Sequence, residues 1–187
     1  MSNRMTEQTK VWITEALFQL LQYKELDDIT VQEICDHAQI SRKTFYRRFR
    51  SKDAVLTLFY QNKILEYKKK VRHVPLKNFT DLINFFFEFW NQYKQELLIL
   101  QKRNLLFNLQ DEYNRQAQSI YLSGDFPWHL TNKKSNELKI SLLMYWSIGG
   151  LWNIVSIWLQ DYPEKSSTEI SHILIAALIA TSHLSHH

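Results

Sequence analysis

The sequence contains a single cysteine, Cys35, and only three glycines and three prolines in 187 residues. One cysteine excludes an internal disulfide and is typical of proteins in a reducing compartment. The shortage of glycine and proline favours long helices joined by short loops. The first ten residues, MSNRMTEQTK, contain no apolar run, so we expect no signal peptide and a cytoplasmic protein.

The short motifs of common enzyme classes are also missing. The sequence has no glycine-rich nucleotide loop, no GxSxG motif and no HExxH motif, which are the patterns of nucleotide-binding, hydrolytic and zinc-dependent sites. Its histidines are scattered and cysteine clusters are absent, so neither a metal nor a cofactor is expected. Because no group of residues meets the requirements of an active site, the chain is predicted not to be an enzyme.

Positive charge is concentrated in the first part of the chain. The formal net charge is only +4, but residues 1–72 carry 14 basic and 9 acidic residues, whereas residues 73–187 carry 9 and 10. Residues 41–52 contain six lysines and arginines and no acidic residue. A basic excess confined to one region is typical of proteins that bind nucleic acid.

Residues 30–52, TVQEICDHAQISRKTFYRRFRSK, are predicted to form two short helices joined by a tight turn. Thr30 and Glu33 have the spacing of a capping box at the start of the first helix. The turn is expected at Gln39 and Ile40, and Ser41 is expected to cap the second helix. The first helix has one apolar face, formed by Val31, Ile34, Cys35 and Ala38.

The second of these helices has two different faces. Phe45 and Phe49 are four residues apart and are expected to point inward. The opposite face is formed by Arg42, Lys43, Tyr46, Arg47 and Arg50. A run of charge alone is often only a solvated helix face. The caps, the turn and the two-sided pattern together favour a helix that enters the major groove of DNA.

This segment resembles the DNA-binding domain of the TetR family of transcriptional regulators. The resemblance covers about residues 11–59 and rests on Ile29-Thr30-Val31, Ile34, Ala38, Ile40-Ser41, Thr44-Phe45-Tyr46, Phe49, Ser51-Lys52 and Val55-Leu56. It implies an all-α protein with a three-helix helix-turn-helix domain in residues 1–58 and a helical regulatory and dimerisation domain in residues 59–187. The expected helices of the first domain are about 6–23, 30–37 and the recognition helix 41–47, with a connecting helix from residue 51.

The resemblance also assigns roles in DNA binding. Arg42 and Lys43 are expected to reach base edges, and Arg47 to contact either bases or backbone. The full set of expected DNA-binding residues is Thr30, Ser41, Arg42, Lys43, Thr44, Tyr46, Arg47 and Lys52. The sequence departs from the family pattern at Gln39, where glycine is usual, and at Lys43, where a small residue is common. If Gln39 needs a left-handed backbone, it costs about 1 kcal/mol relative to glycine.

Residues 140–159, ISLLMYWSIGGLWNIVSIWL, contain no charge over twenty residues. This length suffices for a membrane-spanning helix, but Ser141, Ser147, Asn153 and Ser156 interrupt the apolar run and favour a buried helix. The resemblance implies that the last two long helices, about 136–160 and 167–184, form a dimer interface. Ile148, Gly149, Trp152, Ile173 and Ala177 are expected to lie in it.

The regulatory region is rich in aromatic residues, and a helix beginning at residue 78 is expected to be buried nearly all round. Two further helices, about 96–107 and 109–122, are expected with a break near Asn108, followed by a loop at 124–134. The aromatic residues expected to line an apolar effector pocket are Phe86, Trp90, Tyr93, Trp128, Tyr145, Trp146 and Trp152. The alternative is that they form an ordinary core.

These observations predict a bacterial DNA-binding regulator, most simply an effector-responsive repressor that binds a pseudo-palindromic operator as a homodimer. Two alternatives remain open. The protein could be an activator or co-regulator controlled by a protein partner, without a small-molecule pocket. It could also be attached to a membrane through residues 140–159, although no second apolar span accompanies them.

Overall fold

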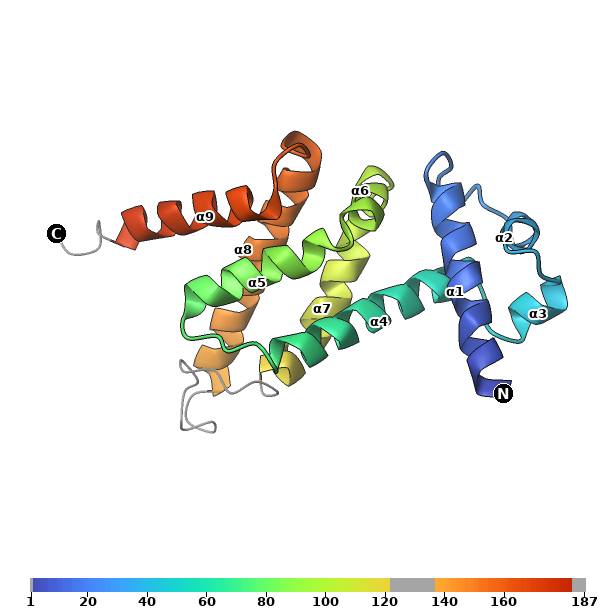
Figure 1. Ribbon diagram of the computed structural model, residues 1–187, viewed down its shortest axis with the longest axis horizontal. Coiled ribbons are helices and arrows are strands. Elements are labelled where there is room, and N and C mark those ends of the chain that lie inside the picture. The colour runs from blue at the N-terminus through green and yellow to red at the C-terminus, as the bar shows by residue number, and fades with distance from the viewer. Residues whose placement is uncertain (1, 122–136, 183–187) are drawn as a thin grey trace.

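The computed structural model describes residues 2–121 and 137–182, and every regular element in these two ranges is a helix (Figure 1). This confirms the predicted all-α class. The helices are α1 (Ser2–Leu21), α2 (Val31–His37), α3 (Arg42–Tyr46), α4 (Lys52–Val71), α5 (Phe79–Asn91), α6 (Lys94–Lys102), α7 (Leu106–Tyr121), α8 (Glu137–Asp161) and α9 (Ser167–Ser182).

Helices α1, α2 and α3 form one end of the molecule, and α4 runs from this end into the lobe formed by α5 to α9 (Figure 1). Helix α1 packs against α2 and α4, and α4 also packs against α7. In the larger lobe α8 packs against α6 and α7, while α9 packs along α5. Helix α4 therefore belongs to both parts, and its orientation sets the position of the helix-turn-helix domain.

The small domain is built around apolar side chains that all three of its helices and the start of α4 contribute. Leu17 of α1, Ile34 of α2, Phe45 of α3 and Val55 of α4 are completely buried. Each lies on the apolar face that the helical period predicts. Because short helices are stable only when such a face is covered, α2 and α3 depend on this shared core.

Helix α5 lies in the centre of the larger lobe. Phe86, Phe87, Phe89 and Trp90 are buried, as predicted for a helix covered nearly all round. Aromatic rings from four other helices or helix ends surround it, and Trp152 of α8 lies 4.8 Å from Trp90 between ring centroids. The centre of this lobe is therefore a packed aromatic core.

Two predicted boundaries differ from the structure. Helix α1 already begins at Ser2, and the break predicted near Asn108 occurs between α6 and α7 at Asn104. Asn104 has a left-handed backbone with φ of 56°. The backbone N–H groups of Asn104 and Leu105 donate to the carbonyls of Gln101 and Leu100 at 3.1 and 2.8 Å. This hydrogen-bond pair ends a helix, and asparagine tolerates the required φ.

Helix α8 contains the uncharged run noted in the sequence. It is the one helix of the described chain that is long and apolar enough to cross a membrane, a test that the core helix of a soluble protein also passes. One side of α8, including Val155 and Trp158, is buried in the lobe. The other side carries exposed apolar residues, among them Leu142, Trp146 and Ile157.

Candidate nucleic-acid interface

Helix α2 begins at a capping box. The Thr30 hydroxyl accepts a hydrogen bond from the Glu33 backbone N–H, and the Glu33 carboxylate accepts one from the Thr30 backbone N–H. This reciprocal pair is the predicted capping box. The Glu33 carboxylate also forms an ion pair with Lys24 in the connection after α1. Together with the Thr30 bonds, this interaction lowers the pKa of Glu33 from 4.5 to about 2.

The turn between α2 and α3 contains one residue with a left-handed backbone, at the position where the family pattern usually has glycine. Gln39 has φ of 52°. The backbone N–H of Ile40 donates to the Cys35 carbonyl at 3.0 Å, and that of Gln39 donates to the Asp36 carbonyl at 3.3 Å. These two bonds form a Schellman motif, in which glycine is the usual residue at the position of Gln39. The turn directs the chain from the end of α2 into Ser41.

Helix α3 is short and is held by its cap and its buried side. The Ser41 hydroxyl accepts a hydrogen bond from the Thr44 backbone N–H at 3.1 Å, which confirms Ser41 as the N-cap. Phe45 is completely buried, and the ring of Phe49, 6.0 Å from that of Phe45, is buried as well. These two anchors fix which side of α3 faces solvent.

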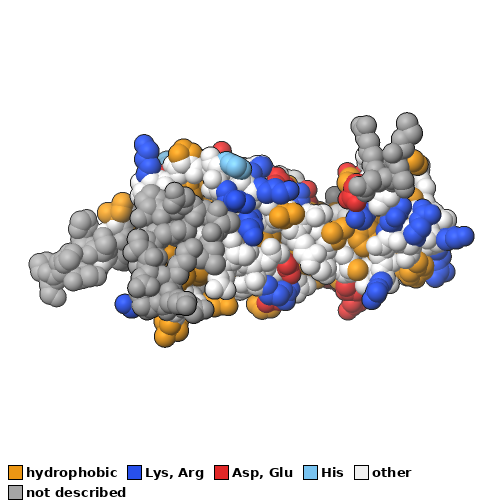
Figure 2. Space-filling model, turned by 90° about the horizontal axis from the view of Figure 1, so that it is seen from below, with side chains coloured by type: hydrophobic (Ala, Val, Ile, Leu, Met, Phe, Trp, Pro, Cys, Tyr) orange, Lys and Arg blue, Asp and Glu red, His pale blue; other side chains and the backbone are white. Residues whose placement is uncertain are grey.

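The exposed side of α3 is cationic. Arg42, Lys43, Tyr46 and Arg47 are all exposed, and the Arg42 guanidinium lies 5.9 Å from the centre of the Tyr46 ring. Lys and Arg side chains gather over this end of the molecule in Figure 2. No acidic residue occurs between residues 41 and 52. The surface can therefore donate several hydrogen bonds to phosphate oxygens or to acceptors on base edges.

The other predicted contact residues have structural partners already. The hydroxyls of Ser41 and Thr44 lie 3.0 Å apart and share a hydrogen bond. The Thr30 hydroxyl is used in the capping box. The Lys52 ammonium donates to the carbonyls of Asp27 and Ile29 at 2.9 and 2.8 Å. Lys52 thus connects the start of α4 to the loop before α2, with one N–H left for another acceptor.

Cys35 lies on the inner side of α2, where it is buried. Burial raises the pKa of its thiol above 9.0. A buried thiol with a raised pKa reacts slowly because the thiolate is the reactive form. The residue therefore acts as a small apolar side chain of the core.

The structure separates the aromatic residues predicted to line an effector pocket. Phe86, Trp90 and Trp152 contact one another in the core, and Tyr93 is half-buried at the end of α5. Tyr145 and Trp146 lie on the exposed side of α8, and Trp146 is 65% exposed. Trp128 lies outside the described residues. The six described members of the set therefore do not surround one common cavity.

A separate cavity of about 310 Å³ lies between the start of α5, the end of α7 and the first half of α8. Among the members of the predicted set that the structure describes, Trp146 alone lines it. Its other lining residues are Phe79, Leu82, Tyr121, Ile140, Leu143, Met144 and Ser147. We call it the regulatory cavity. Its lining is almost entirely apolar and suits an apolar or aromatic molecule.

The residues predicted for a dimer interface are also divided. Ile148 and Trp152 point into the subunit and are buried, and Trp152 is only 1% exposed. Gly149 is half-exposed, and Ile173 and Ala177 lie on the exposed side of α9. The exposed side of α8 is formed instead by Leu142, Trp146, Gly150, Asn153 and Ile157.

The sequence did not indicate the contact that joins the two domains. The Arg103 side chain, at the end of α6, donates from Nε to the Leu21 carbonyl at 2.7 Å and from Nη1 to the Glu25 carboxylate at 2.5 Å. Leu21 ends α1 and Glu25 follows it, so α6 of the larger lobe holds the end of α1. An arginine near the end of a helix can be recognised in the sequence, but its partners cannot. Leu21 and Glu25 lie 82 and 78 residues away from Arg103 in sequence.

Within residues 2–121 and 137–182, no group of three or more His, Cys, Asp or Glu side chains is arranged to hold a metal ion. The chemistry of the surface around α3 is therefore that of cations and hydrogen-bond donors on a rigid scaffold. Such a surface binds a polyanion.

Comparison with known proteins agrees with this geometry. Residues 13–57 match the family described as bacterial regulatory proteins, tetR family. The fold is similar to the crystal structure of a TetR transcriptional regulator from Streptococcus agalactiae 2603V. The TM-score is 0.62 at 18% sequence identity, and the match covers 94% of this chain and 96% of that chain.

The fold is also similar to the dihydroxyacetone kinase operon activator DhaS, with a TM-score of 0.60 and 15% identity over 92% of this chain and 95% of that chain. No curated protein matches the sequence significantly. The matched residues 13–57 include all of α2 and α3, whose outer face is cationic. Residues 13–57 therefore match the tetR family of bacterial regulatory proteins, and the chain as a whole shares its fold with these two solved structures.

Proposed function

We propose that the chain is a cytoplasmic, effector-responsive repressor that binds a pseudo-palindromic operator as a homodimer. The observation that carries the proposal is the exposed face of α3, which presents Arg42, Lys43, Tyr46 and Arg47 to solvent. Helix α3 is fixed by Phe45 and by its Ser41 cap. A recognition helix held in this way can enter the major groove and place its first residues against base edges.

Individual roles follow from the positions of these side chains. Arg42 and Lys43 are at the start of α3, where they would donate to O6 and N7 of guanine. Thr44 and Tyr46 would contact the phosphate backbone. Arg47, one turn after Lys43, would contact either bases or the backbone. We propose only a secondary role in DNA binding for Thr30, Ser41 and Lys52, because their polar groups already form hydrogen bonds within the domain.

Dimerisation is supported by the unpartnered apolar surface of α8 and α9. Leu142, Trp146, Gly150, Asn153 and Ile157 follow one stripe of α8 at intervals of three and four residues, the spacing of helices that pack side by side. A methyl group added at Gly149 or Gly150 would meet no atom within 4 Å in the subunit. These glycines are therefore not needed inside the subunit, but they would allow another helix to approach closely.

Helix α9 also has an exposed apolar face, formed mostly by small side chains. Ile173, Ala176, Ala177 and Ala180 recur at helical spacing and are exposed or nearly so. We infer that this face and the α8 stripe together form the dimer surface. In a dimer with two-fold symmetry, the two α3 helices would enter successive major grooves about 34 Å apart.

The effector is proposed to bind in the regulatory cavity, which is apolar. This cavity lies next to the proposed dimer surface, because Trp146 of the α8 stripe belongs to its lining. An effector bound there could change how α8 meets its partner and thereby the distance between the two recognition helices. It would release DNA only if it binds the released arrangement more tightly than the DNA-bound one.

A second candidate function is that of an activator controlled by a protein partner. Two observations favour it. One of the similar structures is named an operon activator, and the centre of the regulatory domain is filled by Phe86, Trp90 and Trp152 rather than hollow. A promoter reporter distinguishes the two functions, because loss of a repressor raises expression from the target promoter and loss of an activator lowers it.

The DNA-binding proposal is tested by selecting bound fragments from random genomic DNA with the purified protein at two salt concentrations. A palindromic motif with half-sites about one helical turn apart is expected. The affinity should fall steeply as salt is raised, because phosphate contacts release counterions. Salt-sensitive binding without a recovered motif would contradict sequence-specific reading by the protein alone.

A further inference from the structure

Three serines and one asparagine interrupt the uncharged run of α8, and they differ in the partners that the subunit gives them. The Ser147 hydroxyl donates to the Leu143 carbonyl at 2.8 Å, and the Ser156 hydroxyl accepts a hydrogen bond from the Gln101 side chain at 3.0 Å. Asn153 is exposed, and across the described residues no hydrogen bond involves its side-chain amide. The described subunit therefore leaves this amide without a partner.

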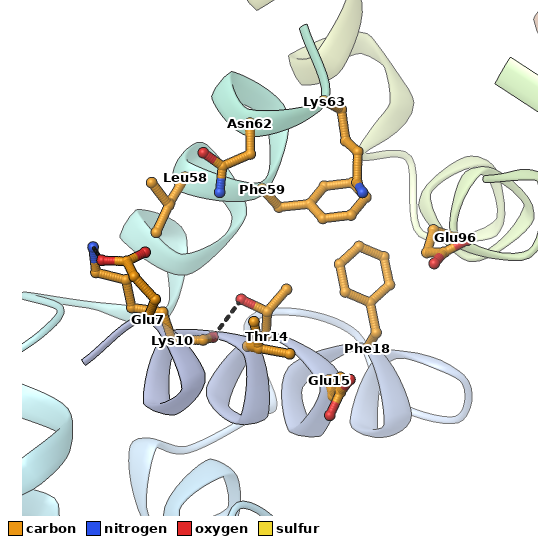
Figure 3. A pocket seen from close by; sticks show the side chains of 11 residues that line it. Glu7, Lys10, Thr14, Glu15, Phe18, Leu58, Phe59, Asn62, Lys63 and Glu96 are labelled. Carbon is orange, nitrogen blue, oxygen red and sulfur yellow. Dashed lines mark hydrogen bonds and ion pairs between the residues drawn. The ribbon is translucent and has the colours of Figure 1, made fainter. Parts of the chain in front are cut away.

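Polar groups at a cavity of about 300 Å³ between α1 and α4 behave like the two serines. The Thr14 hydroxyl donates to the Lys10 carbonyl at 2.9 Å (Figure 3). The Lys10 ammonium lies 2.9 Å from the Glu7 carboxylate, and the Lys63 ammonium lies 3.8 Å from the centre of the Tyr93 ring. These side chains reach partners inside the subunit even though they line a cavity, and the asparagine of α8 does not.

Asn153 lies within the exposed apolar stripe of α8. Its neighbours on this stripe include Leu142, Trp146 and Ile157, which are 61%, 65% and 50% exposed, and no charged residue occurs between residues 140 and 159. If another surface covers the stripe, the amide loses its water, and a buried amide without hydrogen bonds is unfavourable. The covering surface must therefore offer this amide both a donor and an acceptor.

A second copy of the chain meets this requirement at a two-fold axis. In a symmetric contact the same surface faces itself, so residues beside the axis meet their own copies. Because an amide carries both a donor and an acceptor, two copies of Asn153 can hydrogen-bond to each other. Gly150 lies three residues earlier on the same stripe and has no side chain to hold two helices apart, unlike Trp146. Two α8 helices are therefore expected to approach most closely at Gly150 and Asn153.

We propose that the two-fold axis of the dimer passes beside Asn153, where the amides of the two subunits hydrogen-bond to each other. This proposal rests on the proposed homodimer and specifies its register. One polar pair within an apolar contact fixes the alignment of two helices, because a shifted packing buries each amide without a partner. The pair thereby fixes the separation of the two α3 helices, on which binding to two half-sites depends.

The direct test is a disulfide between two introduced cysteines. Asn153→Cys in the full chain should form a covalent dimer on mild oxidation, as seen by non-reducing gel electrophoresis, because a disulfide joins residues whose Cα atoms are about 4.4–6.8 Å apart. The wild type should not crosslink, since its one cysteine, Cys35, is buried. Gln61→Cys is the matched control for random collisions, because Gln61 is exposed on α4, and it should remain uncrosslinked.

A charge at the same position gives an independent measurement. Asn153→Asp keeps the size of the side chain but places two like charges beside the axis. Its dimer dissociation constant, measured by sedimentation equilibrium, should rise at least about tenfold. Asn62→Asp adds the same charge at an exposed position of α4 and should dimerise like the wild type. Thermal unfolding of each variant shows whether it remains folded.

The outcomes separate this proposal from the homodimer on which it rests. A wild-type dimer without a crosslink in Asn153→Cys, or with unchanged dissociation in Asn153→Asp, would overturn the position of the axis and leave the homodimer intact. A wild-type chain that stays monomeric would refute the homodimer and this proposal with it. Because none of these measurements contains DNA, the result of the operator selection does not affect them.

Discussion

Gln39 is the residue at which the backbone departs most clearly from what its side chain favours. With φ of 52°, it occupies the left-handed region that closes the Schellman motif after α2. Gln39→Gly should therefore stabilise the protein by about 1 kcal/mol, since glycine adopts this conformation without the steric cost of a Cβ. Urea unfolding of the two proteins measures the difference.

The neighbouring residue provides the control for this substitution. Ala38 has φ of −78° and lies in the right-handed helical region. Glycine has nothing to relieve there, and Ala38→Gly should destabilise the protein by about 0.5–1 kcal/mol. If both variants were destabilised, the left-handed geometry at Gln39 would not be a source of strain.

Lys43 and Tyr46 test the orientation of α3 on DNA. Lys43→Ala should weaken binding to the selected operator by about 1–3 kcal/mol and relax the preference at one base pair, if its ammonium reads a base edge. Tyr46→Ala should weaken all sequences similarly. Arg72→Ala removes one exposed charge at the far end of α4 and should change operator affinity little. Unchanged binding by both α3 variants in a fluorescence anisotropy titration would refute the assignment of the recognition helix.

At the scale of elements, α2 is stabilised by a charge that titrates in acid. The Lys24 ammonium, followed by the Thr30 backbone N–H and hydroxyl, lowers the pKa of Glu33 from 4.5 to about 2. A lowered pKa means that the ionised carboxylate stabilises the folded state above pH 4.5, and that this contribution disappears as the pH falls toward 2. Glu33→Gln should thus be less stable than wild type at neutral pH, and the difference should shrink in acid.

Thermal melts of both proteins between neutral pH and pH 2 measure this effect. Lys24→Met should reduce the same pH dependence, because the interaction with Lys24 is the largest cause of the shift. A constant difference between wild type and Glu33→Gln across this range would mean that the capping box does not depend on the carboxylate charge.

The end of α6 joins the two domains through Arg103, whose side chain is only 9% exposed. Arg103→Met should destabilise the protein by about 1–3 kcal/mol, because the Leu21 carbonyl loses its donor and a charged hydrogen bond is lost. Glu25→Gln is the comparison. Glu25 is 54% exposed, so the loss of its charge should cost less than about 1 kcal/mol.

Urea unfolding ranks the two variants. Equal losses would show that the ion pair, and not the hydrogen bond to the end of α1, carries the connection. If Arg103 also transmits the state of the regulatory domain, Arg103→Met should reduce the effect of any effector on operator affinity while leaving DNA binding itself largely intact. A full effector response in Arg103→Met would place the transmission elsewhere, for example in the contact between α1 and α4.

The elements that could be predicted from sequence are those whose signals are local. Thr30, Glu33 and Ser41 act within three residues of their partners, so α2, its turn and α3 were located closely. The break between α6 and α7 was misplaced, because Asn104 and Asn108 carry the same local signal and packing decides between them. The contact of Arg103 with Leu21 spans 82 residues and has no local signal at all.

At the scale of the whole molecule, periodicity showed that α8 is apolar on all sides but not which side faces the subunit. Ile148 and Trp152 were predicted for the dimer interface, yet they pack into the core, and Trp152 contacts Trp90 there. Distinguishing the sides of a uniformly apolar helix requires the positions of its neighbours. In this fold α6 and α7 cover one side of α8, and the stripe from Leu142 to Ile157 is the side that remains.

The exposed stripe of α8 leads to a prediction about the proposed dimer. Gly150 is exposed, and a methyl group added there meets no atom within 4 Å of the subunit. Gly150→Leu should therefore leave the isolated subunit folded, and even favour its helix, since leucine has the higher helix propensity. In a dimer packed through α8 the same side chain would be overpacked at a cost of about 1–3 kcal/mol. Dimer dissociation should become about ten- to a hundredfold easier.

Sedimentation equilibrium over a range of protein concentrations measures this change. Gln61→Leu adds the same side chain at an exposed position of α4 and should dimerise like the wild type, which separates a specific clash from general effects of a surface leucine. Gly150→Leu should also lose affinity for a full palindrome while keeping the weaker affinity for a single half-site, because only the linkage of the two heads is broken. If Gly150→Leu remained a dimer with unchanged dissociation, the α8 stripe would not be the interface, and the exposed face of α9 would have to provide it alone.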